Sequence, residues 1–371
     1  MFSQVDFKIS FWKSTVLVLA LSPLVGFLKP ALVSIIDEQL EFGSYALAIA
    51  YSVLLSYFLN SGIYEGLLKE YTNCAEKGEI QKIRLIDAQV KSFWMVVLII
   101  LGFLFSILAL RTSFYLVFAS ILLALSSASF NIFTAKLRVE SRIFTISAVQ
   151  LARLTISLGL TVGLLLKSDL RLGHILFIDA LILCLINTLI FAKNFKFEFA
   201  SRAFFQLYLD IATSAINLTY VSGIRAFSLV LERQAAGLLL TLEHFNQYSQ
   251  LLLLFQSAIV CLGIIPQLWQ QNFMVWTIKI GFKKAVLYQF LFIATVLSAW
   301  IVFWNAVNLL SFDNKFEEQM ITILIVGAAG AIYGGSFIDS ILLGAKNNQG
   351  LIKIYLWALF IAFALLALSY F

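Results

Sequence analysis

Five ionisable residues stand inside long apolar segments of this sequence. They are Lys29, Arg153, Arg225, Asp179 and Glu243. A charged side chain surrounded by hydrocarbon is costly unless it faces protein or water. The cations are suited to binding an anionic group, and arginine offers planar, bidentate donors for phosphate. We therefore expect a polar, largely cationic site inside an apolar protein.

A polar stripe begins at Glu243. Glu243, Asn246, Gln247 and Gln250 follow the i, i+3, i+4, i+7 spacing that places side chains on one face of a helix. We do not expect such a face to contact lipid. Two interpretations stay open: the stripe lines a water-filled path for a polar substrate, or it forms hydrogen bonds to neighbouring helices.

Two of the cations occupy similar places in the two halves of the chain. Lys29 precedes the acidic residue Asp37, and in the second half Arg225 precedes Glu232. This recurrence predicts two parallel repeats that face each other across a cationic central cleft. In the alternative interpretation, Lys29 and Arg225 extend outward to the membrane surface, and Asp179 pairs with one of them.

The spacing patterns of enzyme and metal sites are absent from the sequence. His174 is predicted in an outer loop, His244 stands alone in its segment, and no Ser/His/Asp, HExxH, GxSxG or P-loop pattern occurs. The cysteines Cys74, Cys184 and Cys261 show neither CxxC nor Cys/His spacing. We expect no cofactor, no metal site and no ATP-driven pump.

The composition indicates a membrane protein. Hydrophobic residues make up 61% of the chain, charged residues 12%, and the mean hydropathy is +0.94. A helix needs about 20 apolar residues to cross roughly 30 Å of hydrocarbon, and such segments follow one another along the chain. Barrel strands would be about half as long and would alternate polar with apolar residues. The sequence therefore predicts an all-α polytopic membrane protein.

Apolar runs between charged breaks predict about 11 transmembrane helices. Their ranges are 11–36, 43–64, 91–110, 113–135, 143–166, 173–192, 206–231, 236–267, 285–310, 320–343 and 351–371. Basic residues gather in alternate connections, so the positive-inside rule places the N-terminus in the cytoplasm. The longest connection, between Lys69 and Lys91, is predicted to be a cytoplasmic loop. The net charge of +6 then reflects membrane topology, and we expect no nucleic-acid partner.

We expect the chain to form two bundles. Residues 1–200 form a bundle of six helices, and residues 201–371 form a bundle of five. A twelfth helix would complete the second bundle, and the chain ends at Phe371 where that helix would begin.

Two stretches resemble the polysaccharide-transporter flippases of the MOP (MATE-like) exporter superfamily, which include the O-antigen flippases. The first is FGSYAL at 42–47 followed by LNSGIYEG at 59–66, similar to the family's Tyr/Gly opening and Gly-containing end of the second helix. The second runs from LER at 231–233 through His244 to PQL at 266–268 and is similar to the family's seventh-to-eighth helix region. In helix order and loop charge the likeness covers nearly the whole chain.

The resemblance implies a MATE-like flippase in the bacterial cytoplasmic membrane. Its substrate would be a lipid-linked oligosaccharide on undecaprenyl pyrophosphate, moved by alternating access. Lys29, Arg153 and Arg225 would contact the diphosphate, and the polar stripe beginning at Glu243 would solvate the sugars. Asp179 or Glu243 would bind a coupling proton or sodium ion. Membrane lipids, a polysaccharide polymerase and chain-length proteins are the further expected partners.

Three other functions stay open at this point. An ion-coupled small-molecule or multidrug antiporter of the same superfamily predicts an anionic cavity instead of a cationic one. A polytopic polysaccharide polymerase or ligase predicts a large outer loop, and the predicted outer loops are short. The lack of a twelfth helix is also consistent with an inactive relative.

Overall fold

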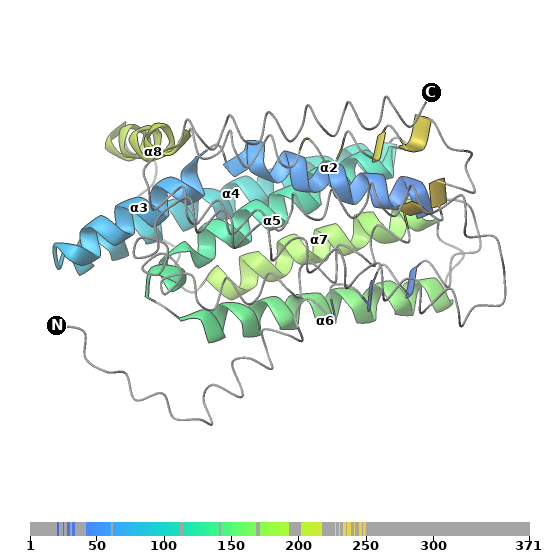
Figure 1. The fold of residues 1–371 in the computed structure, drawn as a ribbon, viewed down its shortest axis with the longest axis horizontal. Helices are drawn as coiled ribbons and strands as arrows, with labels where there is room; N and C mark the ends of the chain where they lie inside the picture. Colours follow the sequence, from blue (N-terminus) through green and yellow to red (C-terminus); the bar gives the residue numbers. More distant parts are fainter. Residues whose placement is uncertain are drawn as a thin grey trace, which may run out of the picture. The chain divides into compact units, whose positions relative to one another are not determined.

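The computed structural model describes residues 42–60, 62–111, 114–140, 142–167, 171–192 and 202–216, with scattered positions between 21 and 33 and between 227 and 249. The chain divides into two compact units, residues 1–246 and 247–371. Nearly all described residues belong to the first unit, and its described elements are all helices (Figure 1).

The first unit contains the described helices in the following order. They are α2 (Phe42–Asn60), α3 (Ile63–Glu76), α4 (Ile80–Arg111), α5 (Tyr115–Val139), α6 (Ile143–Lys167), α7 (Leu172–Phe191) and α8 (Arg202–Ser214). Five of these, α2, α4, α5, α6 and α7, are long and apolar enough to cross a membrane. This confirms the predicted all-α polytopic membrane protein, whereas the total of about 11 spans and the bundle boundary near residue 200 stay predictions.

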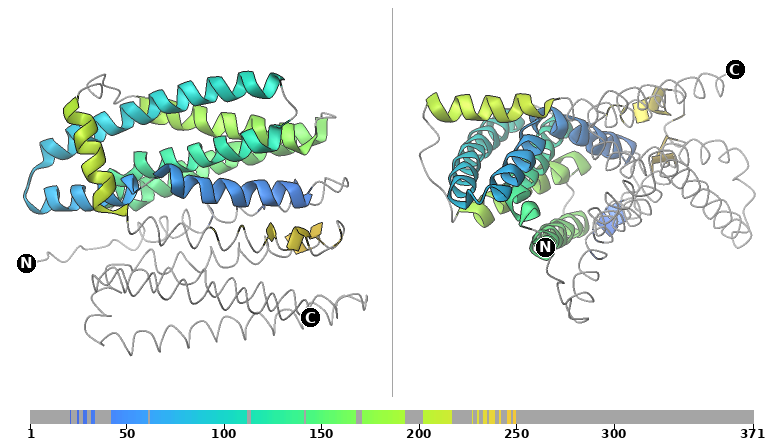
Figure 2. Two further views of the ribbon diagram at one scale, coloured as in Figure 1. Left: turned by 90° about the horizontal axis from the view of Figure 1, so that it is seen from above. Right: turned by 60° about the vertical axis from the view of Figure 1, so that its left-hand side comes forward.

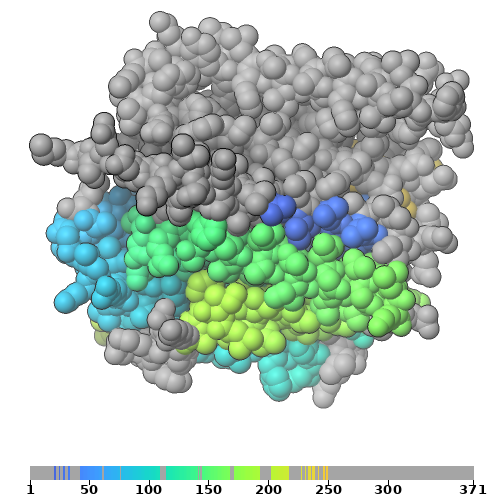
Figure 3. Space-filling view, turned by 90° about the horizontal axis from the view of Figure 1, so that it is seen from below, coloured from blue at the N-terminus to red at the C-terminus, as the bar shows by residue number. Residues whose placement is uncertain are grey.

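Helix α5 is the centre of the described bundle. It packs against α2, α3, α4 and α7, and its buried positions are mostly alanine, serine and leucine. Ala119, Ala124 and Ala128 are fully buried. Because lipid tails give no hydrophobic driving force between spanning helices, small residues stabilise a bundle by letting backbones approach closely. Helix α6 packs mainly on α7 and is seen along the face drawn in Figure 3.

The segment predicted as a loop between Lys69 and Lys91 is instead a helical hairpin. Helix α3 continues to Glu76, Gly78 turns the chain with φ 74°, and α4 begins at Ile80. The prediction was wrong because hydropathy detects membrane crossing, and a helix with many charged residues lies below that threshold. Gly62, with φ 82°, separates α3 from α2 because its left-handed backbone ends the preceding helix.

Candidate functional site

Lys29 and Asp179 form an ion pair inside the first unit. Asp179 lies on α7 and is fully buried, and the Lys29 ammonium donates a hydrogen bond to its Oδ2 atom. Lys29 Nζ also donates to Ser157 Oγ on α6 at 2.7 Å. The ammonium therefore joins the first apolar segment to two spanning helices, and each charge has a partner that offsets its removal from water.

Arg153 lies one helical turn before Ser157 on α6 and is 5% exposed. Its Nη1 donates to Gln150 Oε1 and its Nη2 to Ser126 Oγ, both at 2.9 Å. The guanidinium carbon is 4.2 Å from the centroid of the Phe130 ring, a cation–π contact. Among the described residues, its hydrogen-bond partners are neutral and its Nε atom has none.

Asn187 extends this site along α7. Its amide nitrogen donates to the Ser126 carbonyl at 2.7 Å and to Ser129 Oγ at 3.0 Å, while its Oδ1 is buried without a hydrogen-bond partner. Asn187 follows Asp179 by about two helical turns, so the two side chains lie toward the same side of α7. We call Lys29, Ser126, Arg153, Ser157, Asp179 and Asn187 the polar core.

The polar core lies near the middle of the spanning helices. Arg153 is about 15 Å from the start of α6, a helix of 25 residues that is roughly 37 Å long. At this depth an arginine cannot readily reach either membrane surface, so its charge must be accommodated inside the protein.

The structure brings together three of the predicted site residues, Lys29, Arg153 and Asp179. Asp179 pairs with Lys29, one of the two cations named in the alternative interpretation. The outward extension of Lys29 and Arg225 in that interpretation stays a prediction. Asn246 accepts a hydrogen bond from the Gly43 amide at 2.7 Å, at the start of α2.

Four predicted site residues lie outside the described residues: Arg225, Glu243, Gln247 and Gln250. The shared cationic cleft between the halves therefore stays a prediction.

Sequence reasoning missed the neutral members of the polar core. Ser157 follows Arg153 by four residues and Asn187 follows Asp179 by eight, so each pair shares a helix face. This spacing could have identified Ser157 and Asn187 from the sequence. No comparable spacing identifies Ser126, because single serines are common in spanning helices and often serve only in helix packing.

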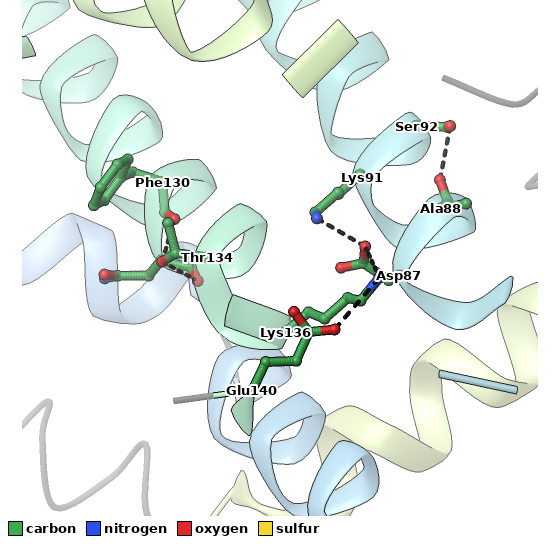
Figure 4. A network of polar contacts seen from close by, with 9 residues as sticks. Asp87, Ala88, Lys91, Ser92, Phe130, Thr134, Lys136 and Glu140 are labelled. Atoms are coloured by element: carbon green, nitrogen blue, oxygen red, sulfur yellow. Dashed lines mark hydrogen bonds and ion pairs between the residues drawn. The ribbon is translucent and has the colours of Figure 1, made fainter. Parts of the chain in front are cut away.

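A second charged cluster links α4 to α5 at the end of the bundle near the α3–α4 turn (Figure 4). Lys91 Nζ lies 2.8 Å from Asp87 Oδ2, and Lys136 Nζ lies 4.0 Å from the same oxygen and 3.9 Å from Glu140 Oε1. Lys91 also lies over the Phe191 ring, 5.6 Å from its centroid. The cluster contains both positive and negative side chains, and they are paired with one another. It therefore stabilises the contact between α4 and α5.

The sequence matches no protein-family model and no curated protein. A solved structure is similar: the crystal structure of the eukaryotic MATE transporter AtDTX14, with a TM-score of 0.52 and 16% identity over 96% of this chain and 93% of that one. The chain has a MATE-like fold. This confirms the predicted fold class, and at this identity the likeness concerns the fold alone. Assignment of this MATE-like chain to the polysaccharide flippases stays a prediction.

Proposed function

We propose that this protein is an alternating-access transporter that moves an anionic, lipid-linked saccharide between membrane leaflets. Its candidate spans and MATE-like fold favour a transporter over an enzyme. The connections from α4 to α5 and from α6 to α7 contain three and four residues. Such short connections leave little chain at that end of the first unit for the site of a polymerase or ligase.

Arg153 carries this proposal. It is a buried cation near the middle of the bundle, and the described residues that bind it are neutral. Its positive charge is therefore available to an anion that approaches the site, and arginine binds phosphate oxygens with two parallel hydrogen bonds. Lys29 contributes less in this state, because its charge is already paired with Asp179.

The Lys29 and Asp179 pair supports a second candidate, an ion-coupled antiporter of small molecules. Asp179 is a fully buried carboxylate whose Oδ1 has no hydrogen-bond partner. A proton or sodium ion that binds Asp179 would compete with the Lys29 ammonium, and this competition would link ion binding to movement of the helices around the pair.

The two candidates are separated by reconstituting the full chain in proteoliposomes. One assay follows a fluorescent diphosphate-linked lipid saccharide from the inner to the outer leaflet, using an impermeant quencher. The other follows ethidium exchange driven by an imposed proton or sodium gradient. We expect lipid transfer by the wild type and an initial rate lowered about 10-fold or more by Arg153→Ala, given the usual strength of hydrogen bonds to charged groups.

Arg138→Ala is the matched control, because Arg138 lies at the end of α5 with its guanidinium over the Tyr64 ring, away from the polar core. A normal transfer rate for Arg153→Ala at normal protein level would reject the role of Arg153. Ethidium exchange without lipid transfer, abolished by Asp179→Asn, would establish the antiporter instead.

A further inference from the structure

Helix α8 crosses the end of the described bundle and does not run along it (Figure 2). It packs on α3, where Ile211 lies against Gly66, and on α4, where Phe93 contacts Phe204 and Trp94 Nε1 donates to the Tyr208 hydroxyl at 3.2 Å. Burial raises the pKa of Tyr208 to about 12, so the phenol stays neutral in this contact. These contacts position α8 beside Gly66 of α3 and beside Phe93 and Trp94 of α4.

The side chains of α8 fall into three groups around the helix. One group lies against the bundle: Phe204, Ile211 and, just after the helix, Ala215 are buried, and Tyr208 is partly buried. The second is apolar and exposed: Phe205 (48%), Leu209 (56%) and Ile216 (38%). The third is polar and exposed: Arg202, Gln206, Asp210 and Thr213. A helix on the surface of a water-soluble protein needs only a buried apolar group and an exposed polar group. The exposed apolar group of α8 therefore indicates a further apolar contact outside the described bundle.

The level of α8 along α4 identifies that partner. The 19 residues from Phe93 to Arg111 measure about 28 Å, which matches the roughly 30 Å hydrocarbon thickness of a bilayer. Within this length, the most exposed apolar residues are Ile99, Ile100 and Phe103. Toward its start α4 carries charged residues, including Lys82 and Arg84. If one membrane boundary is at Arg111, the other therefore lies at Phe93 and Trp94.

Aromatic residues gather at this same level. Phe93 contacts Phe204, Phe205 and Tyr208, and Tyr208 binds Trp94. Tryptophan and tyrosine are enriched at membrane interfaces, where an apolar ring and a polar group are both satisfied. Phe205, one of the exposed apolar residues of α8, contacts the Phe93 ring edge-on, so the exposed apolar row begins beside these aromatic residues of α4.

We propose that α8 is an interfacial helix that binds the lipid leaflet at this end of the bundle. Phe205, Leu209 and Ile216 enter the acyl chains, the group from Arg202 to Thr213 faces water, and Arg202 lies at the level of the lipid phosphates. The helix fixes the depth of the first unit, and it leaves α3 and the first turns of α4 outside the hydrocarbon.

Spin-label accessibility in proteoliposomes of phosphatidylcholine and phosphatidylglycerol tests this placement. Single cysteines replace Phe205, Leu209, Gln206 and Asp210 in a full chain whose native cysteines are changed to alanine. Phe103→Cys serves as the hydrocarbon reference and Thr72→Cys, exposed on α3, as the water reference. We expect the ratio of oxygen to nickel-chelate collision rates to be at least 3-fold higher at 205 and 209 than at 206 and 210.

Two results overturn the proposal. Labels at 205 and 209 that collide with the nickel chelate as often as the label at 72 would show that the row faces water. Labels there that are shielded from both reagents would show that protein covers the row, either a second copy or another chain. Ile216→Cys provides a third position in the row should one of the first two variants fail to fold. Transport activity does not enter the readout, so this test is independent of the proposed function.

Discussion

Buried charges differ in how completely their surroundings neutralise them. Lys29 and Asp179 neutralise each other, and Ser157 accepts a further hydrogen bond from the ammonium. Arg153 binds only neutral groups among the described residues and the face of Phe130. The first arrangement pairs two charges across helices, and under the proposed function the second retains a positive charge for the substrate.

Asp179→Asn should destabilise the protein by about 3 kcal/mol, because it leaves the Lys29 ammonium buried without its carboxylate. SDS-induced unfolding in mixed micelles measures this loss. The double variant Lys29→Met with Asp179→Leu should recover most of it, since replacing both charges by apolar groups removes the unpaired charge. A double variant as unstable as Asp179→Asn would show that the pair is not the source of the loss.

Glu70 on α3 makes stability depend on pH. Lys82 lies 2.9 Å from its Oε1, and this hydrogen bond lowers the pKa of Glu70 below its ordinary value of 4.5. The contribution of the ionised Glu70 to the free energy of unfolding is therefore complete above about pH 4.5, and it is lost as the pH falls through the lowered pKa.

Both side chains are partly exposed, so the contribution should be within about 1 kcal/mol. Hydrogen exchange of the α3 amides from pH 6 to pH 3 should show this pH-dependent loss of stability, and Glu70→Gln should abolish the pH dependence. Glu79→Gln is the control, since Glu79 lies farther from Lys82, at 3.7 Å. An equal pH dependence in wild type and Glu70→Gln would contradict the assignment.

Short-range features decide how the elements of the first unit meet. Gly66 lies where α3 passes α8, and a Cβ atom there would collide with the backbone of Ile211 and lie 2.8 Å from its Cγ2 atom. The position of α8 therefore depends on the absence of a side chain at residue 66.

Gly66→Ala should loosen α8 and cost about 1–3 kcal/mol, the usual range for overpacking. Faster amide exchange in α8 is the measurement. Gly102→Ala in α4 is the matched control, because its Cβ would meet no atom within 4 Å and alanine is the better helix former by roughly 1 kcal/mol. Unchanged exchange in α8 of Gly66→Ala would show that the contact yields without cost.

The spanning helices were the most predictable elements, and the amphipathic ones the least. The ranges 113–135 and 173–192 correspond closely to α5 and α7, since length and hydropathy alone define a membrane crossing. The part of α3 after Lys69 was predicted as a loop, and α8 was predicted as the start of a span at 206–231. In both, burial depends on neighbouring helices that a single sequence does not place. For the same reason, Lys29 and Asp179 were each recognisable as buried charges, while their pairing was one of several alternatives.

At the scale of the whole molecule, the distribution of basic residues predicts the orientation in the membrane. Among the described residues, the end of the first unit that holds the α3–α4 turn carries Lys77, Lys82, Arg84, Lys136 and Arg138, whereas the opposite end carries fewer basic residues. By the positive-inside rule we expect this end to face the cytoplasm.

Impermeant maleimide labelling of intact cells tests this orientation. Phe114→Cys, at the start of α5, should react from outside, and Glu79→Cys, in the α3–α4 turn, should react only after the membrane is opened. Both residues are exposed, so differences in reactivity report sidedness. Labelling of Glu79→Cys in intact cells would reverse the orientation.

The bond between Lys29 and Asp179 has a consequence for biosynthesis. The two residues are 150 positions apart, so at a synthesis rate of about 5–20 residues per second the lysine is made roughly 8–30 s before its counter-ion. During that interval the nascent first segment carries a lone ammonium, at a cost that its flanking leucines and valines offset during insertion. Lys29 consequently forms its ion pair only after the helix containing Asp179 has entered the bilayer.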